Sequence, residues 1–184
     1  MFENDVLQPV VVIHGGRMIV DEALARMREA ATLWSVGRVG GDELIYAACG
    51  LLVAGFDGCS LAMLAGVHVR RADEEIVELL EPALDEVGLR YYPRGSRAGQ
   101  EAAVRLFASR VLAGTLAPRE LTGWAHSVIG HDGLEVAERF VELDDVYDML
   151  EYAAMTEQEV DGEVVDEARR IIGESEPHSA CDGG

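Results

Sequence analysis

Two histidines and two acids surround one glycine in the second half of the chain, and these residue types are suited to chemistry. His126 and His131 flank Gly130, and Asp132 and Glu135 follow closely. Imidazole nitrogens and carboxylate oxygens together can bind a metal ion or transfer a proton. Residues five apart do not share a helix face, unlike the i, i+4 histidines of metalloproteases. The spacing favours two exposed histidines near a helix cap. A small helical metal protein or enzyme centred on His126, His131 and Asp132 is the alternative.

A second group of charged side chains follows and contains only acids. Asp144, Asp148 and Glu151 recur at i, i+4 and i+7, which would place them as one carboxylate ridge along a helix. Three interpretations remain: a solvated face, a docking surface for a basic protein, and a divalent-cation site. The cation site is the weakest, because Ca²⁺ sites usually take their oxygens from a loop that wraps the ion. Tyrosine is a frequent interface anchor. The expected partner-binding residues are Asp144, Asp145, Tyr147, Asp148, Glu151 and Tyr152.

Negative charge is unevenly distributed along the sequence. The chain has 184 residues and a formal net charge of −19. Residues 132–184 contain seventeen acids and three arginines, whereas the preceding 131 residues contain seventeen acids and twelve arginines. A field of one sign attracts opposite charges and repels like ones, so this pattern favours a basic protein partner over DNA. Solubility or salt adaptation would explain the same charge without any partner.

All fifteen basic residues are arginines, which is typical of a GC-rich bacterial genome. The absence of lysine excludes a Schiff-base lysine, a P-loop lysine and a lysine base. Residues 93–131 contain five arginines and only two acids. They would form an anion or RNA patch or, as we favour, pair with the acidic C-terminal helices. These arginines are Arg94, Arg97, Arg105, Arg110 and Arg119.

No reaction is specified by any sequence motif. The nucleophile elbow GxSxG, the dinucleotide motif GxGxxG, the Walker A motif and the EF-hand loop are all missing from the sequence. We therefore expect a non-enzymatic protein without a cofactor. Its oligomeric state is open.

Cysteine usage and hydropathy indicate a cytosolic protein. Cys49, Cys59 and Cys181 form no CxxC pair, so neither a disulfide framework nor a zinc knuckle is indicated. Cys49 lies within an apolar helix pattern, and we expect its thiol to be buried. No run of 18 apolar residues is present, which argues against a membrane span. Glu3 and Asp5 occupy the region where a secretion signal needs basic residues.

Hydrophobic spacing predicts an all-α fold, a compact bundle of seven or eight short to medium helices. The stripe Val136, Phe140, Leu143 and Tyr147 is one example. We expect helices over about residues 21–35, 42–54, 60–65, 73–87, 100–113, 118–129, 133–154 and 157–172. The expected N-caps are Asp42, Asp57 or Ser60, Asp132, and Thr156 with Glu159. Pro82 should kink or divide its helix.

The domain organisation follows from these elements. Residues 1–17 should be loosely ordered, with a short strand at residues 10–13 as an option, residues 18–173 should form a single helical domain, and residues 174–184 should be a disordered tail.

Two functions remain besides the metal alternative. Residues 60–84 resemble a helix-turn-helix, but the acids 73–75 at the start of the second helix would repel DNA, so a regulator is the weaker choice. The leading hypothesis is an immunity-type or inhibitor-type protein. Its acidic C-terminal helices would cover a nuclease or nucleic-acid-binding surface on a basic partner.

Overall fold

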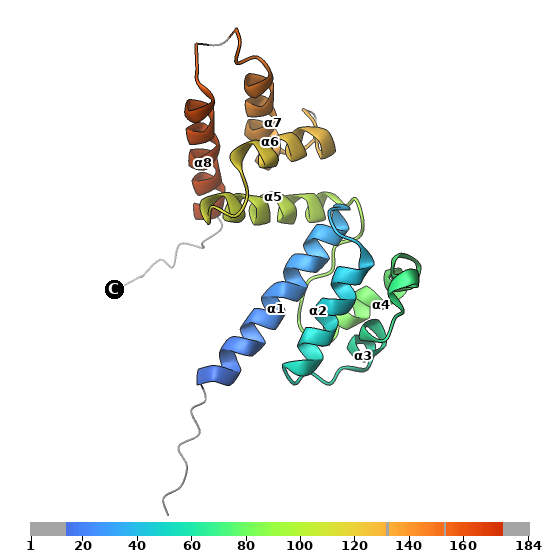
Figure 1. Cartoon of the computed structure of the whole chain (residues 1–184). Coiled ribbons are helices and arrows are strands. Elements are labelled where there is room, and N and C mark those ends of the chain that lie inside the picture. The colour runs from blue at the N-terminus through green and yellow to red at the C-terminus, as the bar shows by residue number, and fades with distance from the viewer. Residues whose placement is uncertain (1–13, 132, 153, 175–184) are drawn as a thin grey trace, which may run out of the picture. The chain divides into compact units, whose positions relative to one another are not determined.

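The fold is entirely α-helical over the part of the chain that is described. A computed structural model describes residues 14–131, 133–152 and 154–174, with side chains from residue 18 onward. Within these residues lie eight α-helices, one 3₁₀ helix and no strand, which confirms the predicted fold class (Figure 1). The elements are α1 (His14–Ser35), α2 (Gly41–Val53), α3 (Cys59–Ala65), η1 (Val69–Arg71), α4 (Ala72–Glu86), α5 (Arg97–Leu112), α6 (Pro118–Val128), α7 (Glu135–Asp148) and α8 (Glu157–Gly173).

The ends of the chain differ from the expectation where they can be compared. Helix α1 begins at His14, within the segment expected to be loosely ordered, and not near Asp21. The optional strand at residues 10–13 lies outside the described residues, as does the predicted tail apart from Glu174. No described helix combines the length and apolar character that crossing a bilayer requires.

The described residues form two compact units. Unit 1 contains the described residues up to Ala31 together with Val39–Tyr91, and unit 2 contains Thr32–Arg38 together with the described residues from Tyr92 onward. Helix α1 therefore contributes its last turn to unit 2 and its preceding part to unit 1. The predicted single domain over residues 18–173 stays a prediction.

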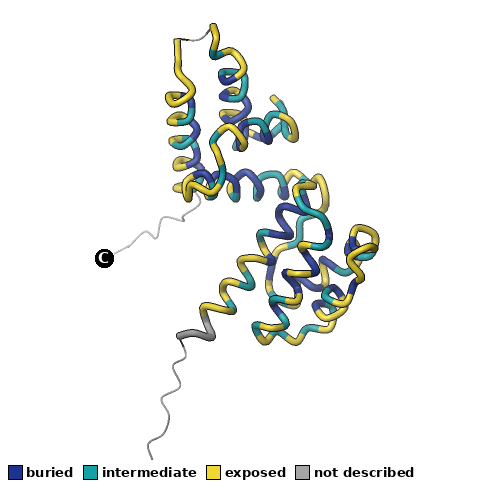
Figure 2. The backbone as a smooth tube through the Cα atoms, in the orientation of Figure 1, coloured by how far each residue is buried: buried dark blue, intermediate teal, exposed yellow. Residues whose placement is uncertain are grey.

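In unit 1, helix α3 packs against both α2 and α4, and α2 also contacts α4. The buried faces are apolar, as the hydrophobic spacing predicted (Figure 2). Gly41 lies at the contact between α2 and α4, because a Cβ atom at this position would lie 2.5 Å from Ile76 Cδ1 and 2.9 Å from Ala72 Cβ. The most deeply buried side chains of these three helices include Leu44, Leu51, Leu61, Leu64, Ile76, Leu80 and Leu84.

Distant carboxylates bind the first amide groups of α2 and α3. The amide of Gly41 donates to Asp73 Oδ1 at 3.1 Å. The amides of Ser60 and Leu61 donate to the two oxygens of Glu86, at 2.8 and 2.9 Å. A helix start leaves such amides without intrahelical acceptors, so these bonds satisfy them.

The predicted N-caps of these two helices were therefore wrong. The residues at the N-cap positions are Gly40 and Gly58, not Asp42, Asp57 or Ser60, and neither glycine has a side chain that can accept. The acceptors come from α4, which packs against both helices.

Two other predictions for unit 1 need correction. Helix α4 continues through Pro82, so the division into two short helices was wrong. Ala83 and Leu84 are buried directly after Pro82, and their packing supports helical continuation. Cys49 is exposed and not buried, since Leu44, Ala48 and Leu51 occupy the inner face of α2.

In unit 2, helix α5 packs against α6 and α8, while α7 packs against α6 and α8. Aromatic rings fill the core: Phe107 meets Trp124 edge-on with 4.5 Å between ring centroids, and Trp34 and Phe140 are also buried. The guanidinium of Arg94 lies 5.3 Å from the Trp34 ring centroid, so this cation covers a core residue.

The helix boundaries in unit 2 show where capping was predictable. Thr156 and Glu159 form the predicted capping box, with the Thr156 amide donating to Glu159 at 2.7 Å. Helix α5 begins at Arg97 and not at Gln100, because the Ser96 hydroxyl accepts from an amide of the first turn.

The predicted boundaries of α7 were wrong at both ends. The N-cap is Leu134, and Asp132, the predicted cap, lies outside the described residues. The helix ends at Asp148, six residues before the predicted Ala154.

Candidate functional site

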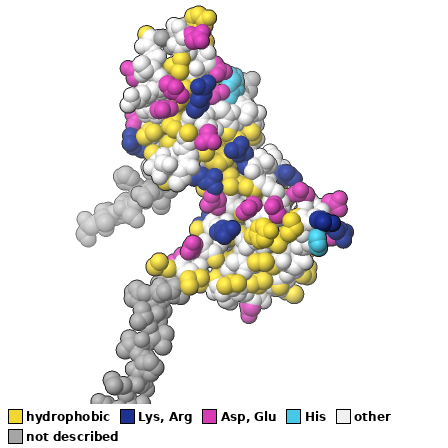
Figure 3. All heavy atoms as spheres, in the orientation of Figure 1, with side chains coloured by type: hydrophobic (Ala, Val, Ile, Leu, Met, Phe, Trp, Pro, Cys, Tyr) yellow, Lys and Arg dark blue, Asp and Glu magenta, His cyan; other side chains and the backbone are white. Residues whose placement is uncertain are grey.

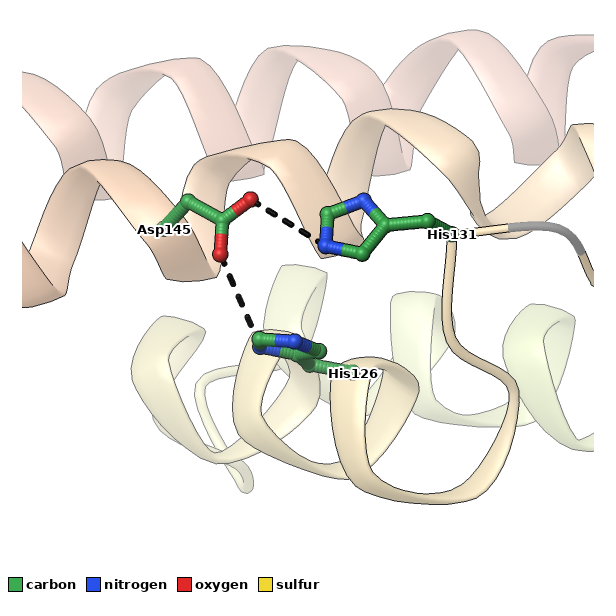
Figure 4. A group of neighbouring side chains, drawn as sticks. All are labelled: His126, His131 and Asp145. Carbon is green, nitrogen blue, oxygen red and sulfur yellow. Dashed lines mark ion pairs between the residues drawn. The ribbon is translucent and has the colours of Figure 1, made fainter.

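A turn after α6 brings the two histidines together. Gly130 has a φ of +72°, a left-handed conformation that glycine adopts without steric cost. Its amide donates to the Ala125 carbonyl at 3.1 Å, which ends the helix. The rings of His126 and His131 then meet edge-on, with 5.1 Å between centroids (Figure 4). The spacing argument against a shared site was therefore wrong, because His131 lies beyond the helix that carries His126.

Two adjacent aspartates of α7 face these histidines. His126 Nδ1 lies 2.9 Å from Asp144 Oδ2, and the Thr122 hydroxyl donates to Asp144 Oδ1 at 3.0 Å. The carboxylate of Asp145 lies beside the two rings and faces both (Figure 4). It is 3.4 Å from His131 Nε2 and 3.9 Å from His126 Nδ1 (Figure 4). Together, His126, His131, Asp144 and Asp145 form what we name the histidine–aspartate cluster.

The carboxylates favour the protonated form of His126. The hydrogen bond to Asp144 is the largest cause that raises the pKa of His126 above its ordinary value. The negative charges of Asp145, Asp144 and Asp148 act in the same direction, and partial desolvation opposes them. With two oxygens near one ring nitrogen, His126 is a cation over a wider pH range than a free histidine.

Asp145 takes the position that the sequence analysis gave to Asp132. One nitrogen of each imidazole and one oxygen of Asp145 all lie within 4.8 Å of one another. Among the described residues, this is the one group of three or more histidine, cysteine or acidic side chains close enough to hold a metal ion. Asp132 lies outside the described residues, so its predicted role as a ligand stays a prediction.

The predicted carboxylate ridge of Asp144, Asp148 and Glu151 is not formed. The side chain of Asp144 is only 16% exposed and is bonded to residues of α6. Glu151 follows the end of α7, so the i+7 relation of a helix does not apply to it. Asp148 is exposed, with Arg119 Nη2 3.7 Å from its Oδ1.

Tyr147 is part of the core and not of the surface. It is 3% exposed, and its hydroxyl donates to Asp161 Oδ1. Burial, followed by this hydrogen bond, raises the pKa of Tyr147 far above its ordinary value. Arg119 lies over the outer face of the ring, with 5.4 Å to the centroid. Tyr147 therefore stabilises the packing of α7 on α8 and has no face open to a partner.

The connection from α7 to α8 carries a mixed acidic and apolar surface. Tyr152 is 86% exposed and Met149 is 58% exposed, and both lie in the turn that follows α7. Apolar and acidic atoms lie together at this end of unit 2, at the top of Figure 3. We define the α7–α8 tip as the exposed residues Asp148, Met149, Glu151, Tyr152, Met155 and Glu157.

Many acids outside the tip have local partners. Arg139 bridges Glu142 and Glu163 at 2.9 and 3.2 Å, and Arg170 pairs with Glu167 and Glu174. Apart from Glu167, whose side chain is 11% exposed, these partners are exposed, and an exposed ion pair stabilises by about 0–1 kcal/mol.

The expected pairing of the mid-chain arginines with C-terminal acids is observed for Arg119. Arg97 instead donates to the Gly133 carbonyl at 3.1 Å and lies 4.0 Å from Glu101. Arg94 covers Trp34, as described above.

The helix-turn-helix-like corner in unit 1 is built from α3, η1 and α4. The acids at its second helix have structural partners: Asp73 caps α2, and Glu75 pairs with Arg71 at 2.9 Å. No basic side chain stands within the first turn of α4. This arrangement offers little positive charge to a phosphate backbone.

Comparison of the chain with protein-family models, with curated proteins and with solved structures found no significant match. We therefore infer function from the charge, exposure and geometry of the described side chains.

Proposed function

We propose that this chain is a non-enzymatic, cytosolic bacterial binding protein whose α7–α8 tip docks onto a basic surface of a partner protein. The observation that carries the proposal is the exposure of Tyr152. Tyr152 is 86% exposed in the turn after α7, which also carries Glu151, and Asp148 and Glu157 lie at the adjoining ends of α7 and α8. Exposed rings inside a charged neighbourhood are typical of interface anchors, and tyrosine is enriched among the residues that dominate binding energy.

The chemistry of the tip defines the partner. The methionines and Tyr152 supply apolar contact area, while the three carboxylates around them require arginine or lysine on the other side. The sequence of unit 2 contains nineteen acids and nine arginines, so a net negative field surrounds the tip and would accelerate the approach of a cationic protein.

An immunity-type or inhibitor-type role follows from this complementarity. A nuclease or another nucleic-acid-binding protein exposes basic side chains where phosphates bind. Carboxylates of the tip would occupy those positions and exclude the nucleic acid. The mechanism is occlusion with electrostatic steering and requires no reaction.

The proposal can be tested by placing a photo-crosslinking amino acid at position 152 of the full chain. Tyr46, on α2, is the matched control because it is also an exposed tyrosine but lies in unit 1. We expect a cationic protein to be crosslinked from position 152 and not from position 46. Equal capture at both positions, or no capture at 152, contradicts the proposal.

The captured partner is then purified and its association rate measured between 50 and 500 mM salt. Tyr152→Ala should weaken binding by about 30-fold or more, the scale of an interface hot spot. Glu151→Gln with Glu157→Gln should mainly slow association and flatten its salt dependence. Tyr46→Ala should change neither quantity. An association rate that does not depend on salt would refute the electrostatic part.

A further inference from the structure

The histidine–aspartate cluster has a donor set that the docking proposal does not use. Its two imidazoles come from α6 and the turn after it, and its carboxylates come from α7, which packs against α6. We propose that His126, His131 and Asp145 form a binding site for Zn²⁺ or a similar divalent transition-metal ion. This site is separate from the α7–α8 tip and does not depend on a protein partner.

The distances are close to those of a metal site. Zinc binds histidine nitrogen and carboxylate oxygen at about 2.0–2.2 Å, so tetrahedral ligand atoms lie roughly 3.3–3.6 Å apart. His131 Nε2 and Asp145 Oδ2 are already 3.4 Å apart. One nitrogen of each histidine and one oxygen of Asp145 all lie within 4.8 Å of one another. Side-chain movements of about 1 Å would therefore bring these atoms to the separations of tetrahedral zinc ligands.

Asp144 provides the outer support that metal-binding histidines usually have. It accepts from His126 Nδ1 and is itself held by the Thr122 hydroxyl, so the orientation of the ring is fixed from two sides. With Nδ1 bonded to Asp144, the nitrogen of His126 available to a metal is Nε2, and the hydrogen bond increases its basicity. The 3.9 Å distance from Nδ1 to Asp145 is therefore an ion-pair distance and not a distance between two ligand atoms. Asp144 is therefore a positioning residue in this site.

The ligand types select the metal. Two imidazoles with one carboxylate suit zinc, copper, nickel or iron, whereas calcium and magnesium prefer a shell of oxygens. Three protein ligands leave a coordination position for water or for an added ligand. Both His126 and His131 are partly exposed, with 35% and 57% of their side chains accessible, so an ion can reach the site from solvent.

The competing explanation is that the cluster contains only ion pairs between protonated histidines and aspartates. Zinc titration of the full chain distinguishes the two explanations. The cysteines are first replaced by serine, because Cys49 and Cys59 are exposed thiols that also bind zinc. Stoichiometry and affinity are then measured by calorimetry and by competition with a chromophoric chelator.

We expect one equivalent of zinc to bind. His131→Ala should weaken binding by more than about 100-fold. Asp144→Asn should weaken it by about 10–100-fold, as loss of an outer partner usually does. His68→Ala is the matched control, because His68 is exposed in unit 1 and should have no effect. His131 lies in a turn, so its variant tests the site even if His126→Ala fails to fold.

Cobalt provides an independent readout. Co²⁺ bound at the site should give visible absorption bands with nitrogen and oxygen ligands, and these bands should disappear in Asp145→Asn. No saturable zinc binding, or binding of equal affinity in His131→Ala and His68→Ala, would overturn the proposal and leave ion pairs as the explanation of the cluster. Neither outcome bears on docking at the α7–α8 tip, which is measured with Tyr152 variants.

Discussion

The two units carry almost the same net charge but use their carboxylates differently. The sequence assigned to unit 1 contains fifteen acids and six arginines, and that of unit 2 contains nineteen acids and nine arginines. The strong skew along the sequence nearly disappears between the units, because the arginines from Arg94 to Arg119 belong to the same unit as the acidic C-terminal helices. Charge counted along a chain is therefore a poor guide to charge counted over a folded body.

In unit 1, the carboxylates that make contacts between distant parts of the sequence bind backbone amides. Asp73 and Glu86 each accept from the first turn of a neighbouring helix, so their charge also interacts favourably with the helix dipole. In unit 2, the corresponding long-range contacts of carboxylates are with side chains: Asp144 and Asp145 face histidines, Asp161 faces Tyr147, and Glu163 faces Arg139. The first use strengthens helix ends, whereas the second leaves groups that can exchange one partner for a ligand.

The largest expected effect tests whether the units are also separate in stability. Phe107→Ala removes a core ring of unit 2 and should lower the free energy of unfolding by about 3–5 kcal/mol, while Leu80→Ala in unit 1 should lower it by about 2–5 kcal/mol. Hydrogen exchange measured for individual peptides should become faster mainly in α5–α8 for Phe107→Ala and mainly in α2–α4 for Leu80→Ala. If either variant accelerated hydrogen exchange equally in both units, the two units would unfold as one cooperative structure. Val53→Ala, at an exposed position, is the control.

A smaller change in stability distinguishes the packing of α2 against α4 from the intrinsic helix propensity of α2. Gly41→Ala places a methyl group against Ile76 and Ala72 and should destabilise by about 1–3 kcal/mol. Gly50→Ala meets nothing within 4 Å and should stabilise by up to about 1 kcal/mol, since alanine favours helix over glycine. Urea unfolding of both variants measures the difference. Equal changes in the two variants would mean that α2 and α4 do not approach as closely as described.

The smallest expected effect concerns the long-range cap of α3. Hydrogen bonds from the Ser60 and Leu61 amides lower the pKa of Glu86. A carboxyl whose folded pKa is depressed stabilises the fold above its unfolded pKa near 4.5, and this contribution is lost as the pH falls through the folded value.

Unfolding followed from pH 3 to pH 7 provides the measurement for this cap. Above pH 4.5, Glu86→Gln should have a lower free energy of unfolding than the natural chain. This difference in free energy should become smaller as the pH falls below 4.5. Glu81→Gln, an exposed acid on the same helix, should show no such pattern. A difference between Glu86→Gln and the natural chain that does not change with pH would rule out the carboxylate cap.

The elements were predictable because hydrophobic spacing is a local property. In the predicted stripe of α7, Phe140, Leu143 and Tyr147 are buried, and the capping box of α8 involves residues only three apart. The caps of α2 and α3 were not predictable, because their acceptors are distant in sequence. Asp73 lies 32 residues after the Gly41 amide, and Glu86 lies 26 and 25 residues after the Ser60 and Leu61 amides. The side chains of Asp42, Asp57 and Ser60 are of types that commonly cap helices. The amides at these helix starts are instead bound by carboxylates that tertiary packing brings close.

The site was predictable only in part. The two histidines were identified, but Asp145 was predicted to bind a partner protein. Its approach to the histidines depends on how α7 packs against α6, which the local sequence does not show. A signal was available for Asp144 and Tyr147. They follow Phe140 and Leu143 by four residues, the spacing of the inner helix face, so their burial could have been inferred from the stripe itself.

The capping of α2 and α3 by α4 has a consequence for synthesis of the chain. On the ribosome, the amide groups that open these two helices leave the exit tunnel before Asp73 and Glu86, which lie 32 residues and 25 or 26 residues further along the chain. Until then, water must occupy the places of both carboxylates, and the nascent helices lack part of their end stabilisation. The long-range caps of unit 1 can therefore be complete only after the last turn of α4, which carries Glu86, has left the exit tunnel.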